Sequence, residues 1–285
     1  MAVEVRKVFL MDEQGNVIDC LLRSSFFNDL GGLGYDDNVT YMDYGDGFFS
    51  PVKRSSKQGT ISGKMSFLDR GTAYADYRRL MNWVSTAETL RSDSAIKLCY
   101  RPYGSDTFTK DVLLTSISKG EIDVGGFLTC NVTFTSLTPW YSVTSLKFTS
   151  STIGNVAGYN LPLYLDADTD GRYMIELSGS FAGMSVRFRD STGTSYGFMD
   201  MTTANYPITG SDTLVFSTIP NNIGIWKRDS GGTLTNLIDQ ISFADGLDVF
   251  PLLKNRENLT LLFRTTASSH SFTGNMNVYS YWKTR

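Results

Sequence analysis

The feature of this sequence that most restricts its fold is the alternation of apolar and polar residues over short segments. From Leu128 to Thr135 every second residue is apolar, and the residues between them are Thr or Asn. Because strand side chains point to the two faces of a sheet in turn, this pattern predicts a strand with one buried face. Similar alternation recurs at 61–67, 184–189 and 259–264. The chain is therefore expected to be mainly β.

One segment departs from this pattern. Thr72 can cap the start of a helix, and apolar residues then recur at helical spacing as far as Val84. The sequence therefore predicts a single amphipathic helix over 72–85 that packs on a sheet. Farther along, Asp190–Gly193 and Asp229–Gly232 have the composition of tight turns between strands.

The length of the chain, 285 residues, suggests about two domains. After Thr138-Pro139-Trp140-Tyr141 the composition changes, and residues 142–158 are rich in Ser, Thr and Gly. We expect a linker over 142–158. It would join an N-terminal domain, 1–141, which is β-sandwich-like with one packed helix, to an all-β sandwich or jelly roll over 159–285.

The least typical segment is 24–52, called the arm here, which carries five aspartates and no Lys or Arg. Two interpretations stay open: a long loop folded onto its own domain, or an extension that reaches a neighbouring subunit. In the second, the acids of the arm would meet the neighbour's bases while its aromatic side chains become buried in an oligomer interface. Those aromatic residues are Phe26, Phe27, Tyr35, Tyr41, Tyr44, Phe48 and Phe49.

An acidic turn offers a weak metal candidate. Asp166, Asp168 and Asp170, followed by Gly171, match the first half of a calcium-binding loop. The second half does not match, since Leu177 stands where the bidentate glutamate is needed. A hairpin turn rich in acids is the expected structure, and no metal or other cofactor is predicted. One histidine and three scattered cysteines are too few for the usual zinc site.

No catalytic residue is predicted either. His270 lies among serines without the G-x-S-x-G turn of a serine hydrolase. Gly31-Gly32-Leu33-Gly34 lacks the lysine of a phosphate-binding loop. The net charge of -3 argues against a nucleic-acid binder, and no apolar run reaches the ~18 residues of a membrane-spanning helix. The expectation is a protein that is not an enzyme and whose function lies in its surfaces.

The order of these elements resembles a known family. The resemblance rests on an early hairpin, the arm, the strand Gly59–Phe67, the helix, the strand Ile96–Arg101, and the closing segment Ser136–Tyr141. In this order the chain resembles the distal tail proteins of long-tailed phages that infect Gram-positive bacteria. The resemblance covers the first half, and the second half agrees in length and in its β-rich pattern.

The resemblance implies a structural role in the virion, at the tip of the phage tail, after assembly in the host cytoplasm. The N-terminal domain would form a homo-hexameric ring. That ring would join the tail tube protein to the tail-associated hub or lysin protein and to baseplate or receptor-binding proteins. DNA would pass through its lumen without specific binding, and no membrane would be involved.

The resemblance also implies a galectin-like C-terminal domain that serves as a docking platform. The galectin sugar signature is absent, and Trp226 stands alone between Ile225 and Lys227. A second class of function stays open, namely a carbohydrate-binding adhesion module of a phage baseplate. Loss of glycan binding on Trp226→Ala would favour this alternative.

Overall fold

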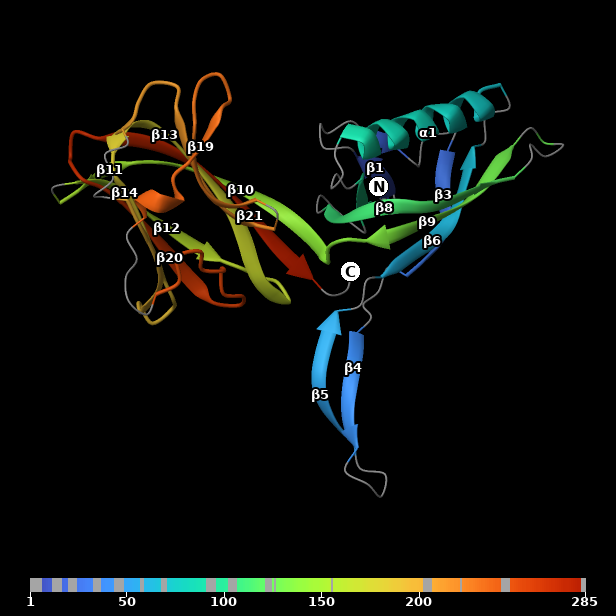
Figure 1. The fold of residues 1–285 in the computed structure, drawn as a ribbon, viewed down its shortest axis with the longest axis horizontal. Coiled ribbons are helices and arrows are strands. Elements are labelled where there is room, and N and C mark those ends of the chain that lie inside the picture. The colour runs from blue at the N-terminus through green and yellow to red at the C-terminus, as the bar shows by residue number, and fades with distance from the viewer. Residues whose placement is uncertain are drawn as a thin grey trace, which may run out of the picture. The chain divides into compact units, whose positions relative to one another are not determined.

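The computed structural model describes residues 7–11, 17–19, 25–32, 37–43, 49–56, 59–67, 71–90, 96–101, 107–120, 125, 127–154, 156–201, 207–220, 222–241 and 247–282. The chain divides into two compact units (Figure 1). The first unit comprises Met1–Ser142 together with Trp282–Arg285, and the second comprises Val143–Tyr281. The fold is mainly β, as the sequence predicts, and its strands form antiparallel sheets. An isolated parallel bridge joins Gly197 to Asp248.

The first unit is built on one antiparallel sheet, with strand order β2–β1–β7–β8–β9–β6–β3. The strands are β1 (Lys7–Met11), β2 (Val17–Asp19), β3 (Ser25–Gly31), β6 (Thr60–Phe67), β7 (Ile96–Arg101), β8 (Phe108–Lys119) and β9 (Leu128–Ser136). The alternation in β9 is confirmed, because Leu128, Cys130 and Phe134 are buried while Thr129 and Asn131 are exposed. In β6 the apolar residues Ile61, Met65 and Phe67 are buried in the same core.

The predicted helix is present as α1 (Ala73–Leu90), which lies against β6 and β7. Ala73 and Leu80 are buried, and Tyr77 packs edge-to-face on Phe67 with 6.2 Å between the ring centroids. The helix continues five residues beyond the predicted end. The extension Thr86–Leu90 contains no Gly or Pro that would stop it, and it contains the good helix formers Ala, Glu and Leu.

The Thr138-Pro139-Trp140-Tyr141 segment closes the core of the first unit. The Trp140 side chain is fully buried, with the Lys110 ammonium 5.2 Å from its ring centroid. Thr138 Oγ1 accepts a hydrogen bond from the Asp111 amide at 3.0 Å, and the Tyr141 hydroxyl donates to Asp111 Oδ1 at 2.8 Å. The segment therefore fixes β8 through both side-chain and backbone groups.

Part of the arm forms a separate hairpin. The strands β4 (Asp37–Asp43) and β5 (Phe49–Ser56) pair only with each other among the described residues (Figure 1). The arm is not one element, because its first part, β3, is an edge strand of the main sheet and pairs with β6. Neither interpretation of the arm, loop or extension, included this strand.

The second unit is a sandwich of two sheets (Figure 1). The larger sheet has the order β19–β18–β17–β13–β21–β10 and the smaller has the order β11–β12–β20–β14–β15. The larger sheet contains β10 (Trp140–Thr149), β13 (Thr169–Ala182), β17 (Thr213–Ile219), β18 (Asn222–Arg228), β19 (Leu234–Asn236) and β21 (Ser271–Trp282), and β16 (Pro207–Ile208) pairs with the end of β13. The smaller sheet contains β11 (Ser151–Ile153), β12 (Val156–Tyr164), β14 (Met184–Arg189), β15 (Ser195–Asp200) and β20 (Asn258–Thr265). A short 3-10 turn, η1 (Ile238–Gln240), follows β19.

Aromatic rings fill the space between these two sheets. The Phe148 ring of β10 lies 4.8 Å from that of Phe263 in β20, measured between centroids. The Tyr173 ring of β13 lies 5.4 Å from that of Phe188 in β14. These rings form the apolar core between the inner faces of the two sheets.

Residues 142–158, expected to be a linker, carry the end of β10, all of β11 and the start of β12. Ser and Thr are compatible with strands when neighbouring strands pair with them. A segment rich in Ser and Thr and poor in charge can therefore be either a linker or a strand, and its composition does not distinguish the two. The chain also returns to the first unit at its C-terminal end. There the Trp282 ring packs edge-to-face on Phe108 at 5.1 Å.

The two predicted Asp-initiated turns are confirmed. The Asp190 carboxylate accepts hydrogen bonds from the amides of Thr192 and Thr194, both at 3.0 Å. The Asp229 carboxylate accepts from the amides of Gly231 and Thr233, at 2.9 and 2.8 Å. Such local bonds replace the backbone pairing that a chain loses where it reverses. Within the described residues, no helix is both long and apolar enough to cross a bilayer.

Candidate functional site: a polar groove in the second unit

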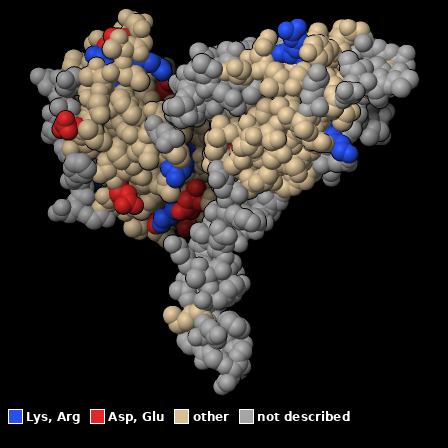
Figure 2. All heavy atoms as spheres, turned by 45° about the vertical axis from the view of Figure 1, so that its right-hand side comes forward, with Lys and Arg blue, Asp and Glu red and all other residues tan. Residues whose placement is uncertain are grey.

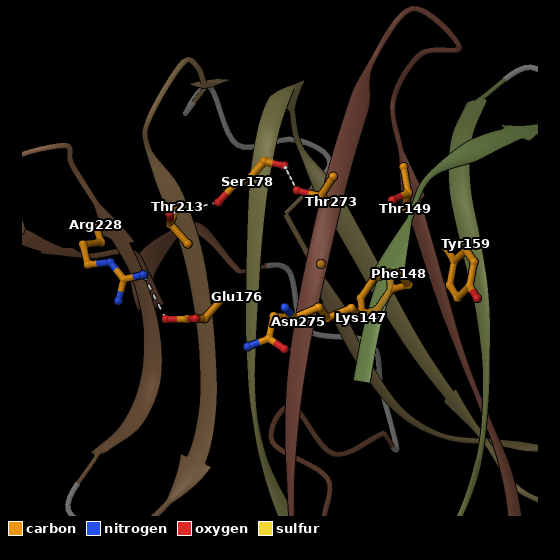
Figure 3. A pocket seen from close by; sticks show the side chains of 11 residues that line it. Lys147, Phe148, Thr149, Tyr159, Glu176, Ser178, Thr213, Arg228, Thr273 and Asn275 are labelled. Carbon is orange, nitrogen blue, oxygen red and sulfur yellow. Dashed lines mark hydrogen bonds and ion pairs between the residues drawn. The ribbon is translucent and has the colours of Figure 1, made fainter. Parts of the chain in front are cut away.

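An open groove of about 620 Å³ lies along the outer face of the larger sheet (Figure 3). Its lining comes from five neighbouring strands, β10, β21, β13, β17 and β18, with Tyr159 of β12 at one end. The volume falls within the ~300–1,000 Å³ typical of small-molecule sites. The groove belongs wholly to the second unit.

A row of hydroxyl groups crosses the groove floor. The strand register places Thr273 beside Ser178, and Ser178 beside Thr213. The hydroxyls of Ser178 and Thr213 lie 3.0 Å apart, and Thr273 Oγ1 donates to the Ser178 carbonyl at 3.5 Å (Figure 3). Because each hydroxyl can donate and accept, this row can bond to either kind of partner.

A charged row runs beside the hydroxyl row. Glu176 lies next to Asn275 in the strand register, and its Oε1 forms an ion pair with Arg228 Nη2 at 2.9 Å (Figure 3). The side chains of Arg228 and Glu176 are 40% and 23% exposed, so the pair itself contributes at most about 1 kcal/mol to stability. Lys147, also exposed, is a second cation in the lining. The groove therefore presents charged hydrogen-bond donors, Arg228 and Lys147, and a charged acceptor, Glu176.

Asn275 holds a buried acceptor on the groove floor. Its Oδ1 atom is shielded from solvent and has no hydrogen-bond donor within the described part of the chain. An unsatisfied buried polar atom costs about 1–3 kcal/mol. A ligand donor that reached this oxygen would recover that cost.

Trp226 borders the groove on the same face. The register of β17 and β18 places it beside Val215, and Val215 lies beside Glu176. The indole lies over Gly224, since a Cβ atom at that position would come within 2.6 Å of Trp226 Cζ2. The missing side chain at 224 therefore lets the half-buried indole rest on the backbone of β18.

The acidic turn carries no metal-site geometry. Asp168 Oδ1 lies 3.6 Å from Arg256 Nη2, and Asp170 Oδ1 accepts a 3.0 Å hydrogen bond from the Asn255 amide. Asp166 is exposed. In the ranges that the structure describes, no three His, Cys, Asp or Glu side chains come together as a metal site would require.

Among the residues that the structure describes, the other chemistry-bearing side chains lie apart from one another. His270 Nδ1 lies 3.5 Å from Thr266 Oγ1 in an exposed turn. Cys99 and Cys130 are buried free thiols, whereas Cys20 lies outside the described residues. Burial raises the pKa of Cys99 to about 11, which disfavours the reactive thiolate at neutral pH.

The predicted interface aromatics are divided between two sheets. Phe26 and Phe27 lie in β3, opposite Ser66 and Met65 of β6. Tyr41 lies in β4 and Phe49 in β5. The remaining three, Tyr35, Tyr44 and Phe48, are outside the described residues.

The surface charges are mixed. On the face that Figure 2 shows, cationic and anionic side chains of the described residues are interspersed. The groove, with its two cations and one anion, follows the same pattern.

The sequence of the first unit matches a known family model. Residues 7–137 match the family model for the distal tail protein, N-terminal domain. This part of the chain resembles a distal tail protein. The resemblance expected from the order of the N-terminal elements is thus confirmed over those residues. No curated protein matches the chain significantly.

The fold of the whole chain is also that of solved phage proteins. A chain of the phage P2 baseplate in its activated conformation with Ca aligns with a TM-score of 0.67 at 14% identity, covering 99% of this chain and 100% of that one. The SPP1 Dit protein, described as a paradigm of the hub adsorption apparatus in phages that infect Gram-positive bacteria, aligns with a TM-score of 0.57 at 14% identity, covering 96% and 98%. At this identity the likeness establishes the fold, and it extends over both units.

Proposed function

We propose that this chain is a non-enzymatic structural protein of the phage tail tip, a distal tail protein that assembles into a hexameric ring. The observation that carries the proposal is the distal tail match over residues 7–137. It is supported by a fold shared along 99% of the chain with a phage baseplate protein. The ring joins the tail tube protein to the hub or lysin protein and to baseplate or receptor-binding proteins, within the virion after assembly in the host cytoplasm.

The isolated hairpin of the first unit supports assembly through that unit. A two-stranded hairpin is marginally stable by itself in water. Strands β4 and β5 pair with no third strand among the described residues, so contact with a neighbouring subunit is a physical means of stabilising them. The five aspartates of the arm, without a Lys or Arg, give that contact an acidic side.

The edges of the main sheet offer a second kind of contact. Within the described residues, β3 and β2 are the outer strands of the first unit's sheet. An edge strand has unpaired N–H and C=O groups that can pair with another chain. Head-to-tail contact of this kind generates a closed ring when the rotation between subunits is one-sixth of a turn.

Charge is consistent with a conduit for DNA. Each subunit has a net charge of -3, so a hexamer carries about -18. Affinity for DNA depends on Lys and Arg that neutralise phosphates. A ring without net positive charge lets DNA slide past rather than hold it.

Light scattering of the purified chain tests the assembly. The expected mass is six times 31.7 kDa. A monomer that persists at high concentration contradicts the ring, and co-purification with the tail tube and hub proteins tests the partners separately.

A further inference from the structure

We propose that the groove of the second unit, together with Trp226, is a binding site for an oligosaccharide built of pyranose rings. The site lies entirely in the second unit, outside the unit through which the ring is proposed to form. It therefore adds a recognition function to the structural role.

The dimensions of the groove suit a chain of linked sugar rings. Neighbouring strands are about 4.8 Å apart, so the lining from β10 to β18 extends across roughly 19 Å. A ligand of several rings laid across the strands would meet a side chain from each of them in turn. The open form of the groove admits such a ligand from the solvent.

The lining matches the hydrogen-bonding chemistry of sugar hydroxyls, each of which donates and accepts. The Glu176–Arg228 ion pair supplies a charged acceptor beside a charged donor, and hydrogen bonds to charged groups are the stronger kind. Each holds the other in place, so less side-chain freedom is lost when a ligand binds. Asn275 Oδ1 adds an acceptor that no donor among the described residues satisfies.

Trp226 provides the apolar part of the site. One face of a pyranose ring carries C–H groups, which pack favourably on an aromatic face. The indole rests on the backbone over Gly224, beside the row of Val215 and Glu176. A rigid Trp next to polar groups is the typical composition of a strong contact point.

The same features disfavour other ligands. A polyanion would need unpaired cations, but Arg228 is paired with Glu176 and only Lys147 is left in the lining. An extended peptide binds by adding to the edge of a sheet, whereas this groove lies on a face whose backbone groups are already paired between strands. Recognition must therefore act through side chains, as it does for sugars.

The test uses the full-length chain with 5-fluorotryptophan in place of its four tryptophans. The probes are lactose, maltotriose, cellotriose and chitotriose at millimolar concentration. We expect at least one probe to shift the ¹⁹F signal of Trp226, assigned by Trp226→Phe, in a saturable manner. Glu176→Gln, which keeps the shape of the side chain, should weaken that binding by about tenfold or more, because it removes a charge-assisted hydrogen bond.

Tyr164→Ala is the matched control. Tyr164 is 56% exposed and lies on β12 of the smaller sheet, so its loss should leave binding unchanged. The proposal is overturned if no probe shifts the Trp226 signal, or if the shift is the same in Glu176→Gln. It is also overturned if a tail protein saturates the signal while no saccharide does, because the face then belongs to a protein partner. The oligomer mass, measured on the same samples, separates these results from any failure of the ring.

Discussion

Replacing Gly274 by alanine tests the packing account of the second unit. Gly274 lies in β21, and a Cβ atom there would come within 2.7 Å of three ring carbons of Phe148. The Phe148 ring cannot move freely, since it stacks on Tyr159 at 5.1 Å between centroids and its centroid lies 4.8 Å from that of Phe263. Overpacking of this kind costs about 1–3 kcal/mol. An alanine in a strand recovers about 0.5–1 kcal/mol of backbone entropy, so we expect a net loss of about 1 kcal/mol.

Calorimetry of the full-length chain measures this loss. For a unit of this size, about 1 kcal/mol corresponds to a fall in Tm of roughly 4 °C. The second change Phe148→Leu shortens the obstructing side chain, so the double variant should be more stable than Gly274→Ala alone. Ser271→Ala, at an exposed position of the same strand, is the control and should stay close to the wild type. An unchanged Tm for Gly274→Ala, or no recovery in the double variant, refutes the packing argument.

Four further outcomes are expected. The raised pKa of Cys99 means that the folded chain keeps this proton between its usual value of 9.0 and about 11, so stability falls as pH rises through that window. Unfolding curves of Cys99→Ala should lack this part of the fall. The pKa of Asp190 is lowered, chiefly by its hydrogen bond from the Thr192 hydroxyl, and Thr192→Val should move the NMR titration of that carboxyl upward. Calcium titrated calorimetrically into the chain should give no heat from the acidic turn at millimolar metal. Replacing residues 37–56 by a short flexible linker should lower the oligomer mass while β3 and β6 stay paired.

The bounds of the last variant follow from the structure. A deletion of residues 26–49 would also remove nearly all of β3, which pairs with β6 at the edge of the main sheet, so it would test more than the hairpin. Aromatic residues occur along the whole arm, yet only its second part forms the hairpin of β4 and β5, whereas its first part forms β3. Strand pairing is set by partners distant in the chain, and composition does not reveal it.

Strands with strict alternation and the helix could be predicted because their signals are local. In β9 each apolar residue faces the core, and in α1 the spacing of Ala73 and Leu80 places both on the buried face. The sequence does not predict the last five residues of the helix or the strands within 142–158. Neither the end of the helix nor the ends of these strands carry a distinctive residue.

The groove could not be predicted from the sequence. Glu176 and Arg228 are far apart in the chain, and Asn275 is farther still. Each is an ordinary outward-facing residue in its own strand, so only the register of β21, β13, β17 and β18 makes them a site. Trp226 stands out in the sequence, but only the strand register shows that Val215 and Glu176 lie beside it.

We propose that this chain builds a six-membered ring at the phage tail tip. Negative-stain electron microscopy of the purified 285-residue chain tests this assembly most directly. We expect ring-shaped particles with six-fold symmetry and an open centre. Uniform particles of monomer size, or closed rings with another symmetry, would contradict it.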